Sequence, residues 1–290
     1  LWYIHTLNRF ANLHLEFSQS FGNQTLAKIY ASRAQNLRRV LVEQYWNLTH
    51  WITNVDYEDQ GEWLDDTVWS QYFNVTNENI SNLLWDRING NRTFFEAVPI
   101  RWTRFDTAHG ACSWFGRLGA GDIMARYRSG QNDHALSLLS KFSSIVVQQH
   151  NIYEGYDMNG CGLQSCGCTT SGFGDYLEHC GGLIWSVVDG LFGWNFDSKS
   201  NEYAATIEPR FPSSWTKRSE MKTSLRGLEV DVRYESGVLS LSGGDAVNGD
   251  DDDDDVDGVA VRVRIVGCDG DDNGDIVVLS RGVEISRKCD

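Results

Sequence analysis

The spacing of hydrophobic residues changes close to residue 195 of the chain. Before this point apolar side chains recur every three or four positions, which is the period of an amphipathic helix. This pattern predicts helices over residues 1–11, 26–45, 79–88, 111–129, 134–149 and 177–191. After Trp194 apolar and polar residues alternate over 228–234 and 259–265, and 276–279 is a short apolar run, so these three stretches are predicted strands.

Long connections, rich in glycine and aromatic residues, separate the predicted helices over 46–71, 94–110 and 151–176. Connections of this length often carry the functional residues of a domain. The expected fold is mainly α, with a helical portion over 1–197 and a small β-rich appendage of antiparallel strands over 198–290. No Pro- or Ser-rich linker separates the two portions, so the appendage is expected to pack on the helices.

Charge and hydropathy narrow the possible partners. The net charge of −15 disfavours binding to the phosphates of nucleic acids. No apolar stretch approaches the roughly 20 residues that span a bilayer. The acidic run at 250–255 is expected to be a solvated loop between strands. Residues 269–275 only superficially resemble a calcium loop, because Ser280 stands where an EF-hand has glutamate, and neither a cofactor nor a metal is expected.

Several features indicate a secreted or extracellular protein. Acceptor sequons for N-glycosylation occur within the first hundred residues, at Asn23, Asn47, Asn74, Asn79 and Asn91. Such a cluster indicates a glycosylated face. The chain begins at Leu1-Trp2-Tyr3 without Met or a targeting segment, so further sequence is expected upstream.

The seven cysteines fit an oxidising compartment. Four cluster together, and two near the end of the chain are expected to form a disulfide that fastens the C-terminal tail. The disulfide candidates are Cys161, Cys166, Cys168 and Cys180 in the cluster, and Cys268 and Cys289 near the end. Cys112 makes the count odd. A zinc site formed by the cluster and His179 is the alternative to disulfides there.

Two loops at the ends of predicted helices combine carboxylates with aromatic residues. The first follows a helix ending near residue 150, and the second begins the next helix. They carry Glu154, Tyr156 and Asp157 in the first loop, and Asp175, Glu178 and His179 in the second. The two loops are expected to face one cleft.

The motif Glu154-x-Tyr-Asp-x-x-Gly160, followed by a Gly-rich loop, Phe173-Gly and a new helix, resembles the end of the catalytic domain in trehalases and processing α-glucosidases. The stretch from Tyr45-Trp-Asn to Asp65-Asp-Thr-Val-Trp-Ser-Gln71 resembles another loop of that family. The resemblance covers roughly residues 1–240. It implies the C-terminal part of an (α/α)6 toroid followed by a small antiparallel β appendage.

The resemblance also implies roles for individual residues. Glu154 falls on the position of the general base of these inverting glycoside hydrolases. A cleft that binds carbohydrate is expected to be lined by Trp69, Gln71, His109, Trp114, Tyr156, Asp175, Glu178 and His179. The family's Asn-Gly-x-x-Trp segment reads His109-Gly-Ala-Cys-Ser-Trp114 here, which leaves the sugar open. The general acid is expected upstream of Leu1, so a missing N-terminal portion of the same protein is an expected partner, covering an otherwise exposed apolar face.

Two functions therefore stay open. The first is a secreted inverting hydrolase of α-glucosidic or related linkages, which needs a protonated acid and an ionised base about 6.5–9.5 Å apart. The second is a non-catalytic carbohydrate-binding or structural extracellular glycoprotein of the same fold. Glu154 in its motif favours the first, and the altered cleft segments favour the second. A terpene-cyclase-like toroid is disfavoured, because no predicted helix carries an Asp-rich metal motif.

Overall fold

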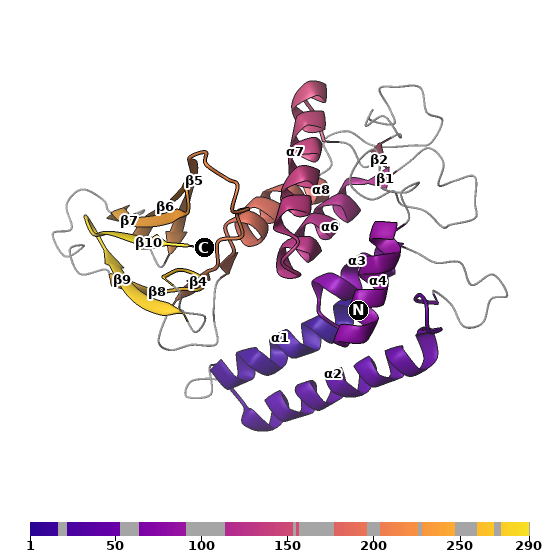
Figure 1. The fold of residues 1–290 in the computed structure, drawn as a ribbon. Coiled ribbons are helices and arrows are strands. Elements are labelled where there is room, and N and C mark those ends of the chain that lie inside the picture. Colours follow the sequence, from indigo (N-terminus) through magenta and orange to yellow (C-terminus); the bar gives the residue numbers. More distant parts are fainter. Residues whose placement is uncertain are drawn as a thin grey trace. The chain divides into compact units, whose positions relative to one another are not determined.

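The structure is a computed structural model that describes residues 1–16, 22–52, 64–90, 114–152, 155–156, 177–195, 204–225, 228–246, 260–269 and 274–289. The chain divides into two compact units, Leu1–Val187 and Val188–Asp290. The first is built mainly of helices and the second mainly of strands (Figure 1). In the part of the chain that is described, no helix is long and apolar enough to cross a membrane.

The helices of the first unit match the apolar periodicity of the sequence, with one addition. They are α1 (Trp2–Glu16), α2 (Gln24–Tyr45), α3 (Leu64–Tyr72), α4 (Glu78–Gly90), α6 (Gly116–Arg128), α7 (Asn132–Gln149) and α8 (Leu177–Trp185), which continues as a π-helical turn, η2 (Ser186–Leu191). The helix predicted over 111–129 begins later, at Gly116. The prediction of a loop over 46–71 was wrong in its last part, where α3 forms.

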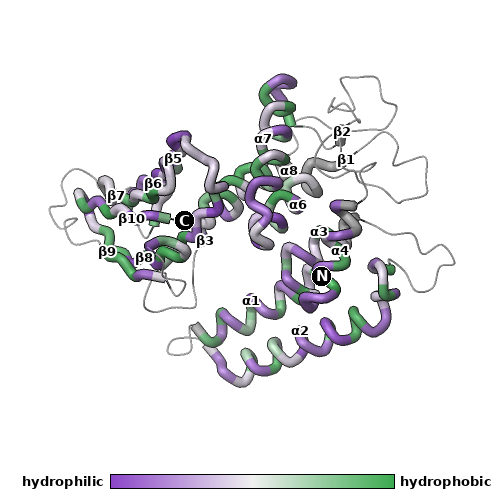
Figure 2. The backbone as a smooth tube through the Cα atoms, in the orientation of Figure 1, coloured by the Kyte–Doolittle hydropathy of each residue, from purple (hydrophilic) through white to green (hydrophobic). Residues whose placement is uncertain are grey.

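Helices α1 and α2 form an antiparallel hairpin (Figure 1). Near the start of α1, Tyr3 lies under the guanidinium of Arg33, with 5.6 Å from the carbon of that group to the ring centroid. Near the end of α1, His14 stacks on Tyr30 at the beginning of α2. Figure 2 shows α2 as a largely hydrophilic helix with scattered hydrophobic positions, so it buries a narrow stripe that includes Ala34.

Helices α1, α3, α6 and α8 contact one another in chain order. Trp2 of α1 meets Trp69 of α3 with ring centroids 5.0 Å apart. On α6, Gly121 leaves room for Trp69, whose ring comes within 3.1 Å of the place that a Cβ would occupy. Gly182 of α8 likewise packs against α6, where a Cβ on residue 182 would meet the side chain of Ala120. The helices α1, α3, α6 and α8 thus form one continuous row.

Helices α2 and α4 meet around Trp51, which follows α2. Trp51, Ile80 and Leu84 form a buried cluster, and Leu41 from α2 packs against it. The indole Nε1 of Trp51 donates a hydrogen bond to Ser70 Oγ at 3.0 Å, which ties this cluster to α3. A row of helices (α1, α3, α6, α8) with α2 and α4 in contact beside it is consistent with a section of a helical toroid.

The second unit contains two four-stranded sheets (Figure 1). Its strands are β3 (Trp194–Asn195), β4 (Ala205–Ile207), β5 (Ser219–Leu225), β6 (Leu228–Glu235), β7 (Val238–Ala246), β8 (Ala260–Ile265), β9 (Asp275–Ser280) and β10 (Glu284–Lys288). The strands predicted over 228–234, 259–265 and 276–279 are confirmed as β6, β8 and β9. One sheet has the order β10-β7-β6-β5 and the other β3-β4-β8-β9.

The appendage is not purely antiparallel, contrary to the prediction. β4 runs parallel to β8, with Ala205 opposite Val263 and Ile207 opposite Ile265. Between these strands the chain builds β5, β6 and β7 of the other sheet. A long connection of this kind can bring the chain back in the same direction, whereas a tight hairpin can join only antiparallel neighbours.

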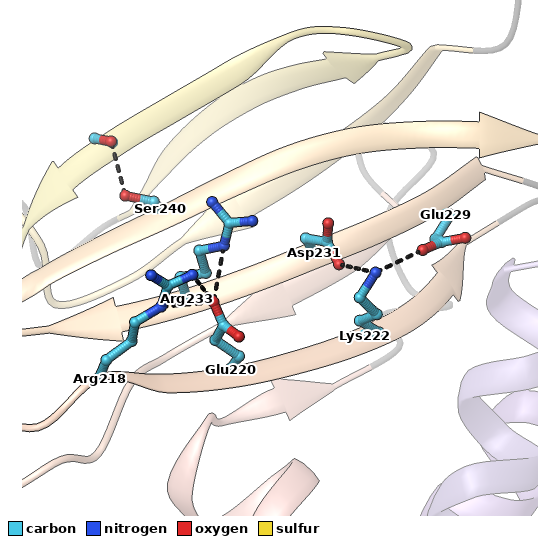
Figure 3. A network of polar contacts seen from close by, with 8 residues as sticks. Arg218, Glu220, Lys222, Glu229, Asp231, Arg233 and Ser240 are labelled. Atoms are coloured by element: carbon cyan, nitrogen blue, oxygen red, sulfur yellow. Dashed lines mark hydrogen bonds and ion pairs between the residues drawn. The ribbon is translucent and has the colours of Figure 1, made fainter.

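The sheet that contains β5 and β6 has one buried apolar face and one exposed charged face. In β6 the alternate residues Leu228, Val230, Val232 and Tyr234 are buried. On the other face of β5 and β6, Glu220 pairs with Arg218 and Arg233, and Lys222 pairs with Glu229 and Asp231 (Figure 3). Charges of both signs at β5, which lies at the edge of the described sheet, disfavour pairing with another chain.

A disulfide joins Cys268, three residues after the end of β8, to Cys289, which directly follows β10, and confirms the predicted pair. The two residues also form an isolated antiparallel bridge through their backbones. Cys180 in α8 is instead a free, partly buried thiol, so the disulfide expected at that position is not formed. The other cluster members, Cys161, Cys166 and Cys168, lie outside the described residues.

Candidate functional site

A short antiparallel ladder brings together two of the loops that the sequence assigns to a cleft. Strand β1 (Trp114–Phe115) pairs with β2 (Gly155–Tyr156). Trp114 stands opposite Tyr156, and Phe115 opposite Gly155. Glu154 lies outside the described residues, but it directly precedes Gly155 in the sequence. The backbone next to the candidate general base is therefore anchored beside the segment that ends at Trp114.

The ladder leads directly into α6, the most buried helix of the first unit. β1 ends at Phe115 and α6 begins at Gly116. From Ala120 to Tyr127 every residue of α6 is buried. A helix enclosed in this way gives β1 a rigid attachment point.

Helix α8, whose first turn contains Glu178 and His179, packs tightly against α6. A Cβ on Gly182 would lie 2.9 Å from the Cβ of Ala120, which is closer than non-bonded Cβ atoms approach other atoms in proteins. One turn later the hydroxyl of Ser186 donates to the carbonyl oxygen of Ala120 at 3.3 Å. Because residue 182 has no side chain, α8 can pack this closely against α6. The distance between the helix after β1 and the helix at the second carboxylate loop therefore depends on Gly182.

Two predicted cleft residues, Trp69 and Gln71, contact other parts of the protein. The ring of Trp69 lies 5.8 Å from that of Phe73, centroid to centroid, in addition to its contact with Trp2. The amide of Gln71 is bound at both ends: its Nε2 donates to the backbone oxygen of Ser81 at 3.2 Å, and the hydroxyl of Ser81 donates to its Oε1 at 2.6 Å. These contacts give Gln71 a role in joining α3 to α4.

The remaining predicted residues fall into two groups. His109, Asp175 and Glu154 lie outside the described residues, as does Asp157. The backbones of the others are placed in regular elements, but their side chains are not described. These are Trp114, Tyr156, Glu178 and His179. The structure thus brings Trp114 and Tyr156 together at the backbone level, and their role in binding stays a prediction.

A buried ion pair on α6 is a feature that the sequence reasoning missed. Arg126 Nε donates to Asp122 Oδ1 at 2.9 Å, and both side chains are fully buried. Burial raises the pKa of Asp122, and the nearby guanidinium opposes this only in part. Arg126 Nη1 also donates to the side-chain oxygens of Asn89 and Gln131, at 3.0 and 2.7 Å. The spacing of four residues between Asp122 and Arg126 in a helix was the available signal.

His134 of α7 completes this network. Its Nδ1 lies 2.9 Å from Arg126 Nη1, and because a guanidinium can only donate, the imidazole nitrogen accepts. Burial, together with the positive charges of Arg126 and Lys141, lowers the pKa of His134 to about 4. His134 is therefore neutral near pH 7 and serves as an acceptor in a structural network.

In the described residues, no group of three or more His, Cys, Asp or Glu side chains is arranged to hold a metal ion. No protein-family model matches the chain, and no curated protein matches it. Among solved structures, a putative kojibiose phosphorylase from human microbiome is similar, with a TM-score of 0.36 and 9% sequence identity. The match covers 59% of this chain and 19% of that protein, so the chain spans about a fifth of its length. A similarity of this size carries no conclusion about the function of this chain.

Proposed function

We propose that the protein acts as an inverting glycoside hydrolase on α-glucosidic or related linkages, with Glu154 as its general base. The observation that supports this most is the β1–β2 ladder. It holds the residue that follows Glu154 beside the segment ending at Trp114. The sequence resemblance places both segments on the wall of one cleft, and the pairing of the two backbones agrees with that placement.

The chemistry requires an ionised carboxylate that takes a proton from water as the water attacks the sugar. Such a base needs polar neighbours that keep it charged at the working pH. Tyr156, Asp157 and His179 are the residues that we propose for this environment. The general acid would stand across the cleft, at a separation of about 6.5–9.5 Å that leaves room for the water.

In this proposal the acid is carried by a further helical portion of the same protein, which would pack on α1. The support is the exposed apolar surface of α1. Trp2 is 57% exposed, Phe10 49% and Leu13 39%, although all three belong to a helix that already buries Ile4 and Leu7 against its neighbours. Large apolar side chains gathered on one helix are typical of a surface that another segment covers.

We further propose that the protein is secreted and N-glycosylated. The sequon residues Asn23, Asn47, Asn74 and Asn79 are all exposed, whereas Asn91 lies outside the described residues. The disulfide between Cys268 and Cys289 is compatible with an oxidising compartment.

The second candidate is a carbohydrate-binding glycoprotein of the same fold without catalytic activity. The binding of both ends of the Gln71 amide to Ser81 favours it, because this residue of the predicted cleft is engaged within the protein. In that case the other cleft residues would bind a sugar, and Glu154 would be an ordinary polar contact.

The stereochemistry of hydrolysis tests the proposal. The complete protein, secreted from a eukaryotic host, is incubated with a panel of α-linked disaccharides, and the products are followed by proton NMR. An inverting enzyme releases the β-anomer first, before mutarotation. Release of the α-anomer first would contradict the inverting mechanism, and sugar binding without hydrolysis would establish the non-catalytic alternative.

A further inference from the structure

A polar groove of about 770 Å³ runs along one face of α4. Along this helix its lining runs from Glu78 through Asn82 and Asp86 to Asn89, a length of about 16 Å at the usual rise per residue. Asn74 lines the groove from the turn after α3. An elongated groove of this kind suits a chain of linked rings better than one compact molecule.

The chemistry of the lining indicates a neutral ligand rich in hydroxyl groups. The carboxylates of Glu78 and Asp86 would repel a phosphate or a sulfate. The side-chain oxygens of Asn89 and Gln131 already accept hydrogen bonds from Arg126, so their NH2 groups are left to donate to a ligand. Amide donors beside carboxylate acceptors match hydroxyls, which donate and accept at once.

Binding in this groove would depend on hydrogen bonds more than on stacking. Trp85 lines the groove, but its side chain is only 7% exposed. The guanidinium of Arg126 lies over the Trp85 ring at 4.8 Å from its centroid and so occupies one face. A free oligosaccharide would therefore bind weakly, whereas one attached to the protein at the groove would be held by its high effective concentration.

Asn74 provides such an attachment. It is the acceptor of the sequon Asn74-Val75-Thr76, is exposed, and has a left-handed backbone with φ of 49°. Its carbonyl oxygen accepts a hydrogen bond from Arg38 Nη2 at 2.7 Å, which fixes the turn. We infer that this groove holds the protein's own N-linked glycan, carried by Asn74. The inference rests on the glycosylation proposed above and is independent of hydrolysis.

Matched variants separate the groove from the sequon. Asn82→Ala removes an exposed groove amide, and Leu83→Ala is its control, because Leu83 is 50% exposed on the same helix and does not line the groove. Thr76→Val removes the sequon without changing Asn74, whereas Thr76→Ser keeps it. Thr76 is buried and its Oγ1 has no hydrogen-bond partner among the described residues, so valine should be tolerated at this position.

The experiment measures how fast an endoglycosidase releases each glycan from the native, complete, secreted protein. Site-specific release is followed by glycopeptide mass spectrometry, with the glycan on the exposed Asn23 as reference. A few hydrogen bonds should slow release at Asn74 by about tenfold relative to Asn23. The Asn82→Ala variant should lose this protection, the Leu83→Ala and Thr76→Ser variants should keep it, and release at Asn23 should not change.

Three results would overturn the inference: an Asn74 that carries no glycan, equal rates of release at Asn74 and Asn23, or protection that persists in Asn82→Ala. The groove could instead bind a saccharide from another source. This is tested by adding free N-glycan oligosaccharides to the Thr76→Val protein, which has no glycan at Asn74. If these oligosaccharides bind the groove saturably while the Asn74 glycan of the wild type is not protected, the groove binds a foreign saccharide and the inference is wrong. None of these results depends on whether Glu154 is catalytic.

Discussion

Trp114 and Tyr156 stand opposite each other in a two-residue antiparallel ladder, although they belong to loops far apart in the sequence. The ladder connects the start of α6 to the segment that follows α7. Glu154 itself lies outside the described residues and comes two residues before Tyr156 in the sequence. The ladder ties the segment that follows the proposed base, Gly155–Tyr156, to the strand that leads into the buried helix α6.

The buried pair between Asp122 and Arg126 should be essential for stability. We expect Arg126→Met to lower the free energy of unfolding by about 3–5 kcal/mol, because it leaves the Asp122 carboxylate buried and unpaired. Urea unfolding followed by circular dichroism measures this change. The exposed pair between Arg39 and Glu43 is the control, since its side chains are 58% and 55% exposed and Arg39→Ala should cost less than about 1 kcal/mol.

The double variant Asp122→Leu/Arg126→Met sharpens this prediction. Replacing both charged partners with apolar groups removes the unpaired charge, so most of the stability lost in Arg126→Met should return. If the double variant is as unstable as the single one, the hydrogen bonds from Arg126 to Asn89 and Gln131 hold the helices together instead.

The depressed pKa of His134 predicts a loss of stability in mild acid. Its pKa is about 4 in the folded protein and 6.5 in the reference state, so the unfolded chain binds more protons between these values. The contribution is fully present above pH 6.5 and is lost as the pH falls towards 4. The ring is partly exposed, so water weakens the effect.

His134→Asn tests this pH dependence. The asparagine oxygen can accept from Arg126 in place of Nδ1, but the amide does not titrate. The unfolding free energy of the variant should therefore fall less steeply than that of the wild type between pH 6.5 and 4. Equal slopes in the two proteins would contradict the assigned role of His134.

The disulfide between Cys268 and Cys289 should stabilise the strand-rich unit. It closes a loop with a sequence separation of 21, for which the loss of chain entropy in the unfolded state corresponds to about 3 kcal/mol. Cys268→Ser/Cys289→Ser should lower the stability of this unit by that amount in chemical denaturation. Cys180→Ser is the matched control, because Cys180 is a free thiol and its replacement removes no cross-link. An equal loss in both variants would argue against a stabilising cross-link.

The sequence predicted best those elements whose buried face is apolar. Helix α7 buries Ala135, Leu138, Leu139 and Phe142, which follow a helical period, and it was predicted within two residues of its observed start. Helix α3 was missed for the opposite reason. Its buried positions include the polar Thr67, Ser70 and Gln71, so its inner face does not stand out as hydrophobic.

The strands show the same dependence on neighbours. β6 was predicted from its alternation, but β5 (Ser219–Leu225) and β10 (Glu284–Lys288) are mostly polar and lie at the edges of the described sheet. Only their pairing with β6 and β7 makes them strands, and that pairing is not visible in the local sequence. The parallel contact of β4 with β8 depends in the same way on the long path between them.

For the candidate site, the sequence resemblance placed Trp114 and Tyr156 in one cleft, and the cleft itself stays a prediction. The β1–β2 ladder pairs the backbones of these two residues. The double hydrogen bond between Gln71 and Ser81 was not predicted, because Ser81 follows ten residues later on another helix. The network of Arg126 joins α4, α6 and α7 and likewise requires the packed helices to be known.

The replacement of Glu154 by glutamine tests the proposed function most directly. Glutamine keeps the shape of the side chain but cannot take a proton from water, so hydrolysis by the complete secreted protein should fall by about 10²–10⁴-fold in kcat, with a much smaller change in sugar binding. Glu43→Gln, which makes the same replacement at an exposed carboxylate on α2 outside the proposed cleft, is the matched control and should leave kcat unchanged. Full activity of Glu154→Gln in a protein whose wild type hydrolyses an α-linked disaccharide would contradict the assignment of Glu154 as the general base.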